Sequence, residues 1–403
     1  MEKSAVVYLF TGKYPYGLTI EGYLDLELKY LSKRFDKIVI VPTRGEDIIR
    51  AVPENCEVLK TVFPPKVLFL LKGLFCRRSF RFVWGDFFKN KVFLNWKRFE
   101  VWLRGSLVTN NLLNSKTIKG IEQNLKTNDI CYYYWGKWSN VLSYFWQGKC
   151  HHVSRFHGGW DLWEEEYDNY APFRDKIAAS LDQAFFISKL GYEFFNKHYK
   201  VRKTSIDSLG TADFGCKTNR NDGVIRVMSC SSIYPIKRVP LIYEAVHYYA
   251  KTNDGNRVEW MHIGGGEGYE SIKQLTSKNE LSNLKIVLPG QTKHDKVLEY
   301  YKEFNPDIYI NLSTTEGVPV AIMEAISFNV PIVATNVGST SEVVTDETGV
   351  LVSPNPTMEE IAGAIANVVN CELSPREFWL KNYNAETNYG NFADALVEIS
   401  LME

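Results

Sequence analysis

The chain has 403 residues, which is long for one hydrophobic core and sufficient for two domains. Its 47 basic residues balance 47 acidic ones, so no overall field favours nucleic acid, and any basic surface must be local. The seven cysteines are scattered and form no C-x-x-C pair, which argues against structural zinc and disulfides and for a reducing, cytoplasmic setting.

The first half of the chain opens with the pattern of a doubly wound parallel sheet. A buried strand is predicted over residues 4–10 and another over 37–41, with a glycine-bearing loop and an amphipathic helix between them. Ligands bind at the carboxyl ends of such strands, so Gly12 and Gly17 are candidate binding residues. An ordinary βα turn is the alternative.

Residues 64–105 have a different composition. Ten basic residues stand against two acidic ones, and eleven Phe and Trp residues are interleaved with them. This mixture favours reversible contact with an anionic membrane at the cytoplasmic face, at about 1 kcal/mol for each cation that reaches the surface. The alternative is a pair of amphipathic helices that pack on the domain. Single-stranded nucleic acid is not expected, since the rest of the chain is neutral.

A histidine loop follows a strand predicted over 151–156. His157 lies at the end of that strand, between Arg155 and two glycines, with Asp161 four residues further on. A lone histidine is more often structural, but its place at the carboxyl edge of a sheet favours a functional role.

A polar, glycine-bearing stretch over 211–223 predicts a linker between domains 1–210 and 224–374. After it, strands and helices of 10–15 residues alternate again, which predicts a second doubly wound parallel sheet. Residues 375–403 are expected to be helical and to return to the first domain.

The stretch 307–325 predicts a strand, a polar loop and a helix that starts near Val318, with Pro319 in its first turn. The N–H groups and dipole of a helix start favour a phosphate. Glu316 and Glu324 bracket this turn, and carboxylates beside an anion suggest that they bind sugar hydroxyls. A nucleotide sugar is the ligand that fits both features.

Two cations, Lys237 and Arg238, follow the first strand of the second domain and could clamp a diphosphate. Gly264 to Gly266 end another strand there. They do not match G-x-G-x-x-G and predict a tight turn that allows close approach.

These segments together resemble retaining glycosyltransferases of the GT-B fold, family 4, also called group 1. The carboxylates Glu316 and Glu324 match the E-x7-E element, and SCSSIYPIKRVPLIYEAV, VEWMHIGGGEGYESI and VPIVATNVGSTSEVVTDETGVLV match other parts of the donor domain. The resemblance is strong over 224–370 and weaker in the first half. It implies two Rossmann-like domains that face each other across a cleft.

The resemblance also implies residue roles. Glu316 would face the donor sugar, Glu324 the ribose, and Lys237 the diphosphate, while His157 would lie near the donor sugar and the acceptor. The catalytic candidates are therefore His157, Lys237 and Glu316. The further donor-binding candidates are Gly12, Gly17, Ser232, Arg238, Gly317, Val318, Pro319, Val320 and Glu324, and the acceptor-side candidates are Arg155 and Asp161. The family usually has an arginine where Ser232 stands, so a two-cation clamp requires Arg238 to supply the second charge.

The expected reaction moves a sugar from a nucleoside-diphosphate sugar to a glycan or lipid-linked acceptor, in bacterial surface polysaccharide synthesis. Neither a metal nor a cofactor is expected, because cations and a helix start can stabilise the leaving phosphate and no D-x-D motif occurs. A sugar-nucleotide epimerase of the same fold and a non-catalytic sugar-nucleotide-binding scaffold are the alternatives.

Overall fold

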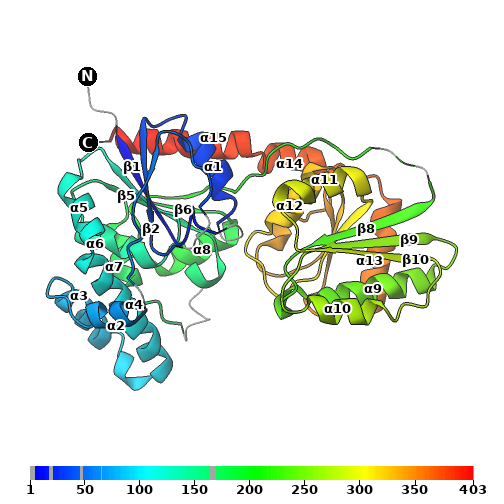
Figure 1. The fold of residues 1–403 in the computed structure, drawn as a ribbon, viewed down its shortest axis with the longest axis horizontal. Helices are drawn as coiled ribbons and strands as arrows, with labels where there is room; N and C mark the ends of the chain where they lie inside the picture. The colour runs from blue at the N-terminus through cyan, green and yellow to red at the C-terminus, as the bar shows by residue number, and fades with distance from the viewer. Residues whose placement is uncertain are drawn as a thin grey trace. The chain divides into compact units, whose positions relative to one another are not determined.

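The computed structural model describes residues 5–17, 21–45, 49–64, 66–162, 169–218, 220 and 222–402, without the side chains of residues 67 and 160. Residues 65, 219 and 221, which fall in the expected basic segment and linker, lie outside this set. The chain forms two compact units, here called unit 1 (Met1–Ser208 and Asn388–Glu403) and unit 2 (Leu209–Thr387) (Figure 1).

Unit 1 contains a parallel seven-stranded sheet in the order β3-β2-β1-β4-β5-β6-β7. The strand order reverses between β1 and β4, and ligands bind at such switch points in open α/β sheets. The strands are β1 (Val6–Thr11), β2 (Lys37–Pro42), β3 (Cys56–Val58), β4 (Ile130–Tyr133), β5 (His151–Phe156), β6 (Gln183–Phe186) and β7 (Thr204–Ile206).

Helices cover both faces of this sheet because both faces are apolar. Val7 and Leu9 of β1 share a core with α1 (Leu24–Leu31) and α15 (Ala385–Ser400). Tyr8 and Phe10 point to the other face, which carries α4 (Trp96–Asn114), α5 (Lys116–Asn124), α6 (Leu142–Phe145), α7 (Arg174–Ser180) and α8 (Lys189–His198). From Asn388 onward the last helix is therefore part of unit 1, whereas residues 375–387 belong to unit 2 instead of returning to the first domain as expected.

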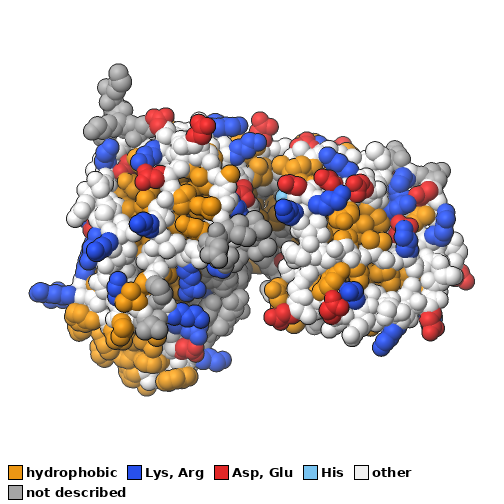
Figure 2. Space-filling model, viewed as in Figure 1, with side chains coloured by type: hydrophobic (Ala, Val, Ile, Leu, Met, Phe, Trp, Pro, Cys, Tyr) orange, Lys and Arg blue, Asp and Glu red, His pale blue; other side chains and the backbone are white. Residues whose placement is uncertain are grey.

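The basic, aromatic segment folds into α2 (Lys66–Gly73), α3 (Phe80–Lys89), a 3₁₀ turn η1 (Val92–Leu94) and the start of α4. Some of its aromatic rings, such as Phe82 and Trp102, are buried in the core. The exposed large hydrophobic residues of the segment are here called the apolar patch, and they are Leu68, Leu70, Leu71, Leu74, Phe75, Phe80, Trp84, Phe88, Phe93, Leu94, Trp96 and Leu103. Figure 2 shows hydrophobic surface, in orange, gathered over the region of α2 to α4. Within the described part of the chain, no helix has the length and apolarity needed to cross a membrane.

Unit 2 contains a parallel six-stranded sheet in the order β10-β9-β8-β11-β12-β13, with its switch point between β8 and β11. Its strands are β8 (Val224–Cys230), β9 (Arg257–Ile263), β10 (Leu284–Gly290), β11 (Ile308–Asn311), β12 (Ile332–Thr335) and β13 (Gly349–Val352). Its helices are α9 (Val239–Thr252), α10 (Tyr269–Thr276), α11 (His294–Phe304), α12 (Val320–Ser327), α13 (Met358–Asn370) and α14 (Pro375–Asn382). The prediction of two doubly wound parallel sheets is confirmed.

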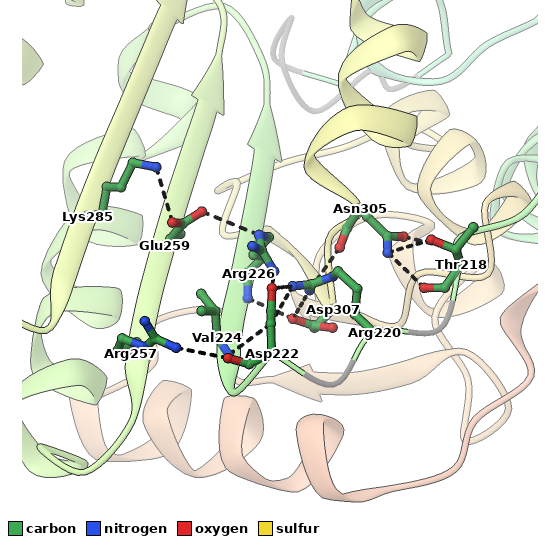
Figure 3. Close-up of polar contacts among 10 residues, drawn as sticks. All are labelled: Thr218, Arg220, Asp222, Val224, Arg226, Arg257, Glu259, Lys285, Asn305 and Asp307. Carbon is green, nitrogen blue, oxygen red and sulfur yellow. Dashed lines mark hydrogen bonds and ion pairs between the residues drawn. The ribbon is translucent and has the colours of Figure 1, made fainter.

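An ionic network stabilises the amino-terminal edge of the unit 2 sheet (Figure 3). The carboxylate of Asp307, just before β11, accepts hydrogen bonds from the N–H of Arg226 at 2.8 Å and the guanidinium of Arg220 at 2.9 Å. Arg226 also pairs with Glu259 of β9 at 3.4 Å. These bonds join three neighbouring strands at the edge opposite the strand ends that carry the candidate site.

Candidate active site

Two loops meet at the carboxyl edge of unit 2, one after β8 and one after β11. The N–H of Thr314 donates to the carbonyl of Ile236 at 2.8 Å, which holds the loops together. The guanidinium of Arg238 donates to the carbonyls of Leu312 and, at 2.9 Å, Ser313. Arg238 precedes α9 in a left-handed conformation (φ 47°) and occupies its N-cap position. Its guanidinium ties the two loops together.

Lys237 and Glu316 form an ion pair between these loops. The Nζ of Lys237 lies 2.6 Å from Oε1 of Glu316, and the side chains are 25% and 11% exposed. The amide of Asn311 donates to the same carboxylate oxygen at 3.1 Å. The pair is thus partly shielded but open to a ligand, with a cation and a carboxylate side by side.

The start of α12 lies directly after Glu316. Pro319 occupies the N-cap in extended geometry, and the helix starts at Val320 rather than near Val318. Among the described residues, the N–H groups of Gly317, Val318 and Val320 make no hydrogen bond. A Cβ on Gly338 would lie 1.9 Å from the carbonyl oxygen of Glu316, so the backbone of a neighbouring loop packs directly on this turn. The arrangement is a helix start with free donors, suited to an anion.

Glu324 is one turn into α12 and pairs with His294 at the start of α11. The His294 Nε2 lies 2.6 Å from Oε1 of Glu324, whose side chain is 12% exposed. Sequence reasoning missed both Asn311 and His294, because they belong to no motif themselves and His294 is 30 positions from Glu324.

The glycine turn after β9 packs against the loop that carries Ser232. The N–H of Ile233 donates to the carbonyl of Gly265 at 2.7 Å. A Cβ on Gly264 (φ 149°) would lie 1.9 Å from the carbonyl oxygen of Ser231. The turn therefore needs glycine for close approach, and Ser232 lies exposed in the loop that it supports.

In unit 1, the loop after β1 encloses the carboxylate of Glu21, which sequence reasoning missed. The N–H groups of Gly12, Lys13 and Tyr14 donate to it at 2.8, 2.8 and 2.6 Å. Glu21 is 3% exposed, and its carboxylate occupies the donors that this turn offers. The carbonyl of Gly17 accepts a bond from Arg50 at 2.7 Å. Both candidate glycines therefore have partners inside the unit.

His157 is 9% exposed, and its ring packs against the rings of Tyr134 and Trp135. The distances between ring centroids are 4.6 Å to Tyr134 and 4.7 Å to Trp135. Burial, together with the charge of Arg155, lowers the pKa of His157 to about 3, so the ring is neutral at pH 7. Its Nε2 lies 2.9 Å from the carbonyl oxygen of Tyr134 and must carry the hydrogen. Nδ1 is then a hydrogen-bond acceptor.

Asp161 holds the His157 loop in place. Its carboxylate accepts the N–H of His157 at 3.0 Å and the N–H of Gly136 at 3.3 Å. Asp161 is fully buried, and burial raises its pKa to about 6. It is a positioning residue for the loop.

Arg155 has no exposed surface. Its guanidinium pairs with Glu27 at 2.5 Å and with Asp207, and it lies 4.3 Å from the ring centroid of Phe392 in α15. Arg155 thus stabilises the packing of α15 on the sheet, and this geometry does not present it to an acceptor.

Cys131, Cys150 and His152 form a buried group of metal-ligand residue types. The two sulfur atoms are 3.5 Å apart. The ring nitrogens of His152 lie 3.2 Å from the Tyr133 hydroxyl and 3.2 Å from the Trp146 carbonyl. Since both nitrogens have hydrogen-bonding partners, we interpret the group as part of the core.

Comparison with known proteins finds relatives of part of the chain. Residues 216–385 match the family model "Glycosyl transferases group 1". The chain is 26% identical over 133 residues to the phosphatidylinositol N-acetylglucosaminyltransferase GPI3 subunit of Saccharomyces cerevisiae. The aligned segment covers 33% of this chain and 28% of that protein. The chain is also 32% identical over 113 residues to an uncharacterized glycosyltransferase of Haemophilus influenzae. That alignment covers 28% of this chain and 31% of that protein. The chain thus spans less than a third of the length of these relatives.

Solved structures match over nearly the whole chain. The lipopolysaccharide outer core galactosyltransferase WaaB superposes with a TM-score of 0.67 at 12% identity, over 98% of this chain and 99% of WaaB. Anabaena HepE in complex with UDP-glucose superposes with a TM-score of 0.64 at 15% identity, over 98% of this chain and 100% of HepE. The fold is therefore GT-B, as predicted. Within that fold, the second unit matches the glycosyl transferase group 1 model.

Proposed function

We propose that the protein is a retaining glycosyltransferase of family 4 that takes a sugar from a nucleoside-diphosphate donor and transfers it to a glycan or lipid-linked acceptor. The observation that carries this proposal is the Lys237–Glu316 pair beside the free N–H groups at the start of α12. Lys237 and the helix start would stabilise the charge that grows on the departing diphosphate. Glu316 would bind donor-sugar hydroxyls, and Glu324 the ribose hydroxyls.

We propose attack on the same face that the diphosphate leaves, with a phosphate oxygen taking the acceptor proton. The placement of Glu316 supports this, because its carboxylate is bonded to Lys237 and Asn311 at the helix start, where hydroxyl recognition is expected. Double displacement would need a carboxylate on the sugar face opposite the leaving group. One cation is proposed to hold the diphosphate, since the Arg238 guanidinium is bonded to two loop carbonyls.

Synthesis of a bacterial surface polysaccharide at the cytoplasmic face of the plasma membrane is the proposed setting. Its support is the exposed apolar patch over α2 to α4, together with the similarity to a lipopolysaccharide galactosyltransferase. The same segment carries ten basic residues, of which nine are exposed and Arg98 is partly buried. Apolar side chains that insert and cations that attract anionic headgroups would together give reversible attachment.

A donor panel tests the proposed function. Purified protein is incubated with UDP-, GDP-, ADP- and dTDP-sugars, and release of nucleoside diphosphate is measured with and without glycan acceptors. Release from one donor, accelerated by an acceptor, is expected. An epimerised nucleotide sugar, or tight binding without any release, would replace the proposal with an epimerase or a scaffold.

A further inference from the structure

A cavity of about 160 Å³ lies in unit 1, between α4, the loop after β4 and the start of α7. The loop after β4 includes the 3₁₀ turn η2 (Trp138–Val141). Since β4 and β1 flank the switch point of this sheet, the loop after β4, which forms one wall, lies at the edge where open α/β sheets bind ligands.

The cavity wall and the His157 loop share one anchor. Gly136 and Arg174 both line the cavity. The N–H of Gly136 donates to the carboxylate of Asp161 at 3.3 Å, and the guanidinium of Arg174 donates to the carbonyl of Asp161 at 3.0 Å. The same carboxylate accepts the N–H of His157 at 3.0 Å. A ligand in the cavity would therefore lie beside the histidine loop.

The walls are largely apolar, with Val101, Val108 and Ile177 among them. Polar side chains interrupt them, namely Arg104, Thr109, Lys137, Arg174 and the buried amide of Asn140. Asn140 is 0% exposed, and neither its Nδ2 nor its Oδ1 has a hydrogen-bond partner among the described residues. Burying an amide without partners is costly, so such a side chain suggests a ligand that completes its bonds. An amide offers a donor and an acceptor together and complements neighbouring polar groups on one molecule.

The size and rim of the cavity narrow the ligand further. A cavity of about 150 Å³ holds one benzene molecule, so this one can enclose no more than one six-membered ring, and the substituents of a sugar ring would extend towards its mouth. Trp138 lines the cavity, is 39% exposed and has φ 65°, a conformation that is unusual for a bulky residue and is found most often at functional sites. Its indole offers a flat apolar face to the C–H face of a sugar ring.

We propose that this cavity binds one pyranose residue of the acceptor, with the amide of Asn140 bonded to two neighbouring polar groups of the sugar and Trp138 packed against the ring. The inference rests on the proposed function, which supplies the need for an acceptor glycan. Two hydroxyls, or a hydroxyl next to an acetamido group, would serve equally as the neighbouring groups.

Binding of simple glycosides tests the proposal. Methyl glucopyranoside and its 2-acetamido-2-deoxy counterpart are titrated into the full chain and followed by saturation-transfer NMR. The variants are Asn140→Leu and, as a matched control, Asn124→Leu on the exposed side of α5. At least one glycoside should bind the wild type and the control, and binding should weaken at least tenfold in Asn140→Leu. The preferred glycoside tells the two kinds of polar pair apart.

Thermal melting separates a ligand-binding amide from a structural one. Replacing an unsatisfied buried amide by Leu should leave the melting temperature unchanged or raise it, because a desolvated polar group is removed. If Asn140→Leu fails to fold, Val101→Phe, which places a ring in the cavity, is the deciding variant and should block glycoside binding. Glycosides that do not bind the wild type, or that bind these variants equally well, would overturn the proposal.

Donor hydrolysis by the wild type keeps this proposal separate from the proposed function. Release of nucleoside diphosphate without any Asn140-dependent glycoside binding contradicts only the cavity assignment. Asn140-dependent glycoside binding without release from any donor leaves the sugar site in place and contradicts the transferase proposal.

Discussion

The Nζ of Lys237 lies 2.6 Å from Oε1 of Glu316, and this contact joins the loop after β8 to the loop after β11 at the switch point of unit 2. The two residues are 79 positions apart. A donor diphosphate would share the Lys237 ammonium, and the sugar would take up the carboxylate. The pair therefore holds two ligand-binding groups in place before the ligand arrives, which lowers the cost of ordering them.

Removing the charge of Lys237 should slow the transfer reaction. A charge-assisted hydrogen bond contributes about 1.5–3 kcal/mol, so Lys237→Ala should lower kcat/KM by about ten- to hundred-fold. The steady-state rate of nucleoside diphosphate release, measured against donor concentration, gives this kcat/KM. Lys273→Ala, which removes an exposed cation of α10, is the control and should match the wild type. Unchanged kinetics in Lys237→Ala would exclude this lysine from the site.

Glu324 should recognise the ribose. In the wild type, a 2′-deoxynucleoside diphosphate should bind about tenfold more weakly than its ribonucleotide, by calorimetry. Glu324→Gln should reduce that difference, because the strong acceptor is lost. His294→Ala should have a smaller effect, because His294 acts through Glu324. Glu270→Gln, at an exposed site, is the control and should keep the wild-type preference for the ribonucleotide. The same preference in Glu324→Gln would contradict the assignment of Glu324 to the ribose.

The buried His157 should make stability depend on pH. Its folded pKa of about 3 lies below the value of about 6.5 in the unfolded chain. Between these values the unfolded state binds the extra proton, so stability falls as pH falls. Compared with His157→Gln, the wild type should lose about 1.6 kcal/mol more unfolding free energy between pH 6.5 and 5.

Urea denaturation at each pH measures this difference. His198→Gln, at an exposed site, serves as the control and should follow the wild-type pH profile. Parallel profiles for the wild type and His157→Gln would show that the ring is not held neutral by the fold.

The exposed apolar patch should attach the protein to anionic membranes. Leu94 and Trp96 are 71% and 76% exposed, so Leu94→Ser with Trp96→Ser should reduce binding to vesicles containing phosphatidylglycerol without lowering the melting temperature. Leu401 and Met402 are 72% and 50% exposed elsewhere on unit 1, and the same change there is the control. Binding in sedimentation assays should also fall with salt. Equal sedimentation of both double variants would contradict the membrane contact.

The two parallel sheets follow from features that are visible in the sequence. Apolar runs such as 6–11 and 308–311, separated by amphipathic helices, predict buried parallel strands. Strand β3 was not predictable, because its three residues are partly exposed and form no apolar run. The start of α12 shifted by two residues because Pro319 takes an extended conformation and caps the helix instead of entering it.

The site was only partly predictable. Glu316, Glu324 and Lys237 follow strands at recognisable positions. Asn311 contacts Glu316 locally, five residues away, and His294 reaches Glu324 from another helix, and neither contact leaves a motif in the sequence. Burial, which the sequence does not display, distinguishes the fully enclosed Arg155 from a surface cation.

Turnover of the active donor by Glu316→Gln tests the central claim most directly. The expected result is a loss of about a hundredfold or more in nucleoside diphosphate release, with a melting temperature close to that of the wild type and no glycosyl adduct on intact wild-type protein by mass spectrometry. Wild-type turnover in Glu316→Gln would contradict the assignment of the site, and a sugar covalently bound to Glu316 would contradict the same-face mechanism.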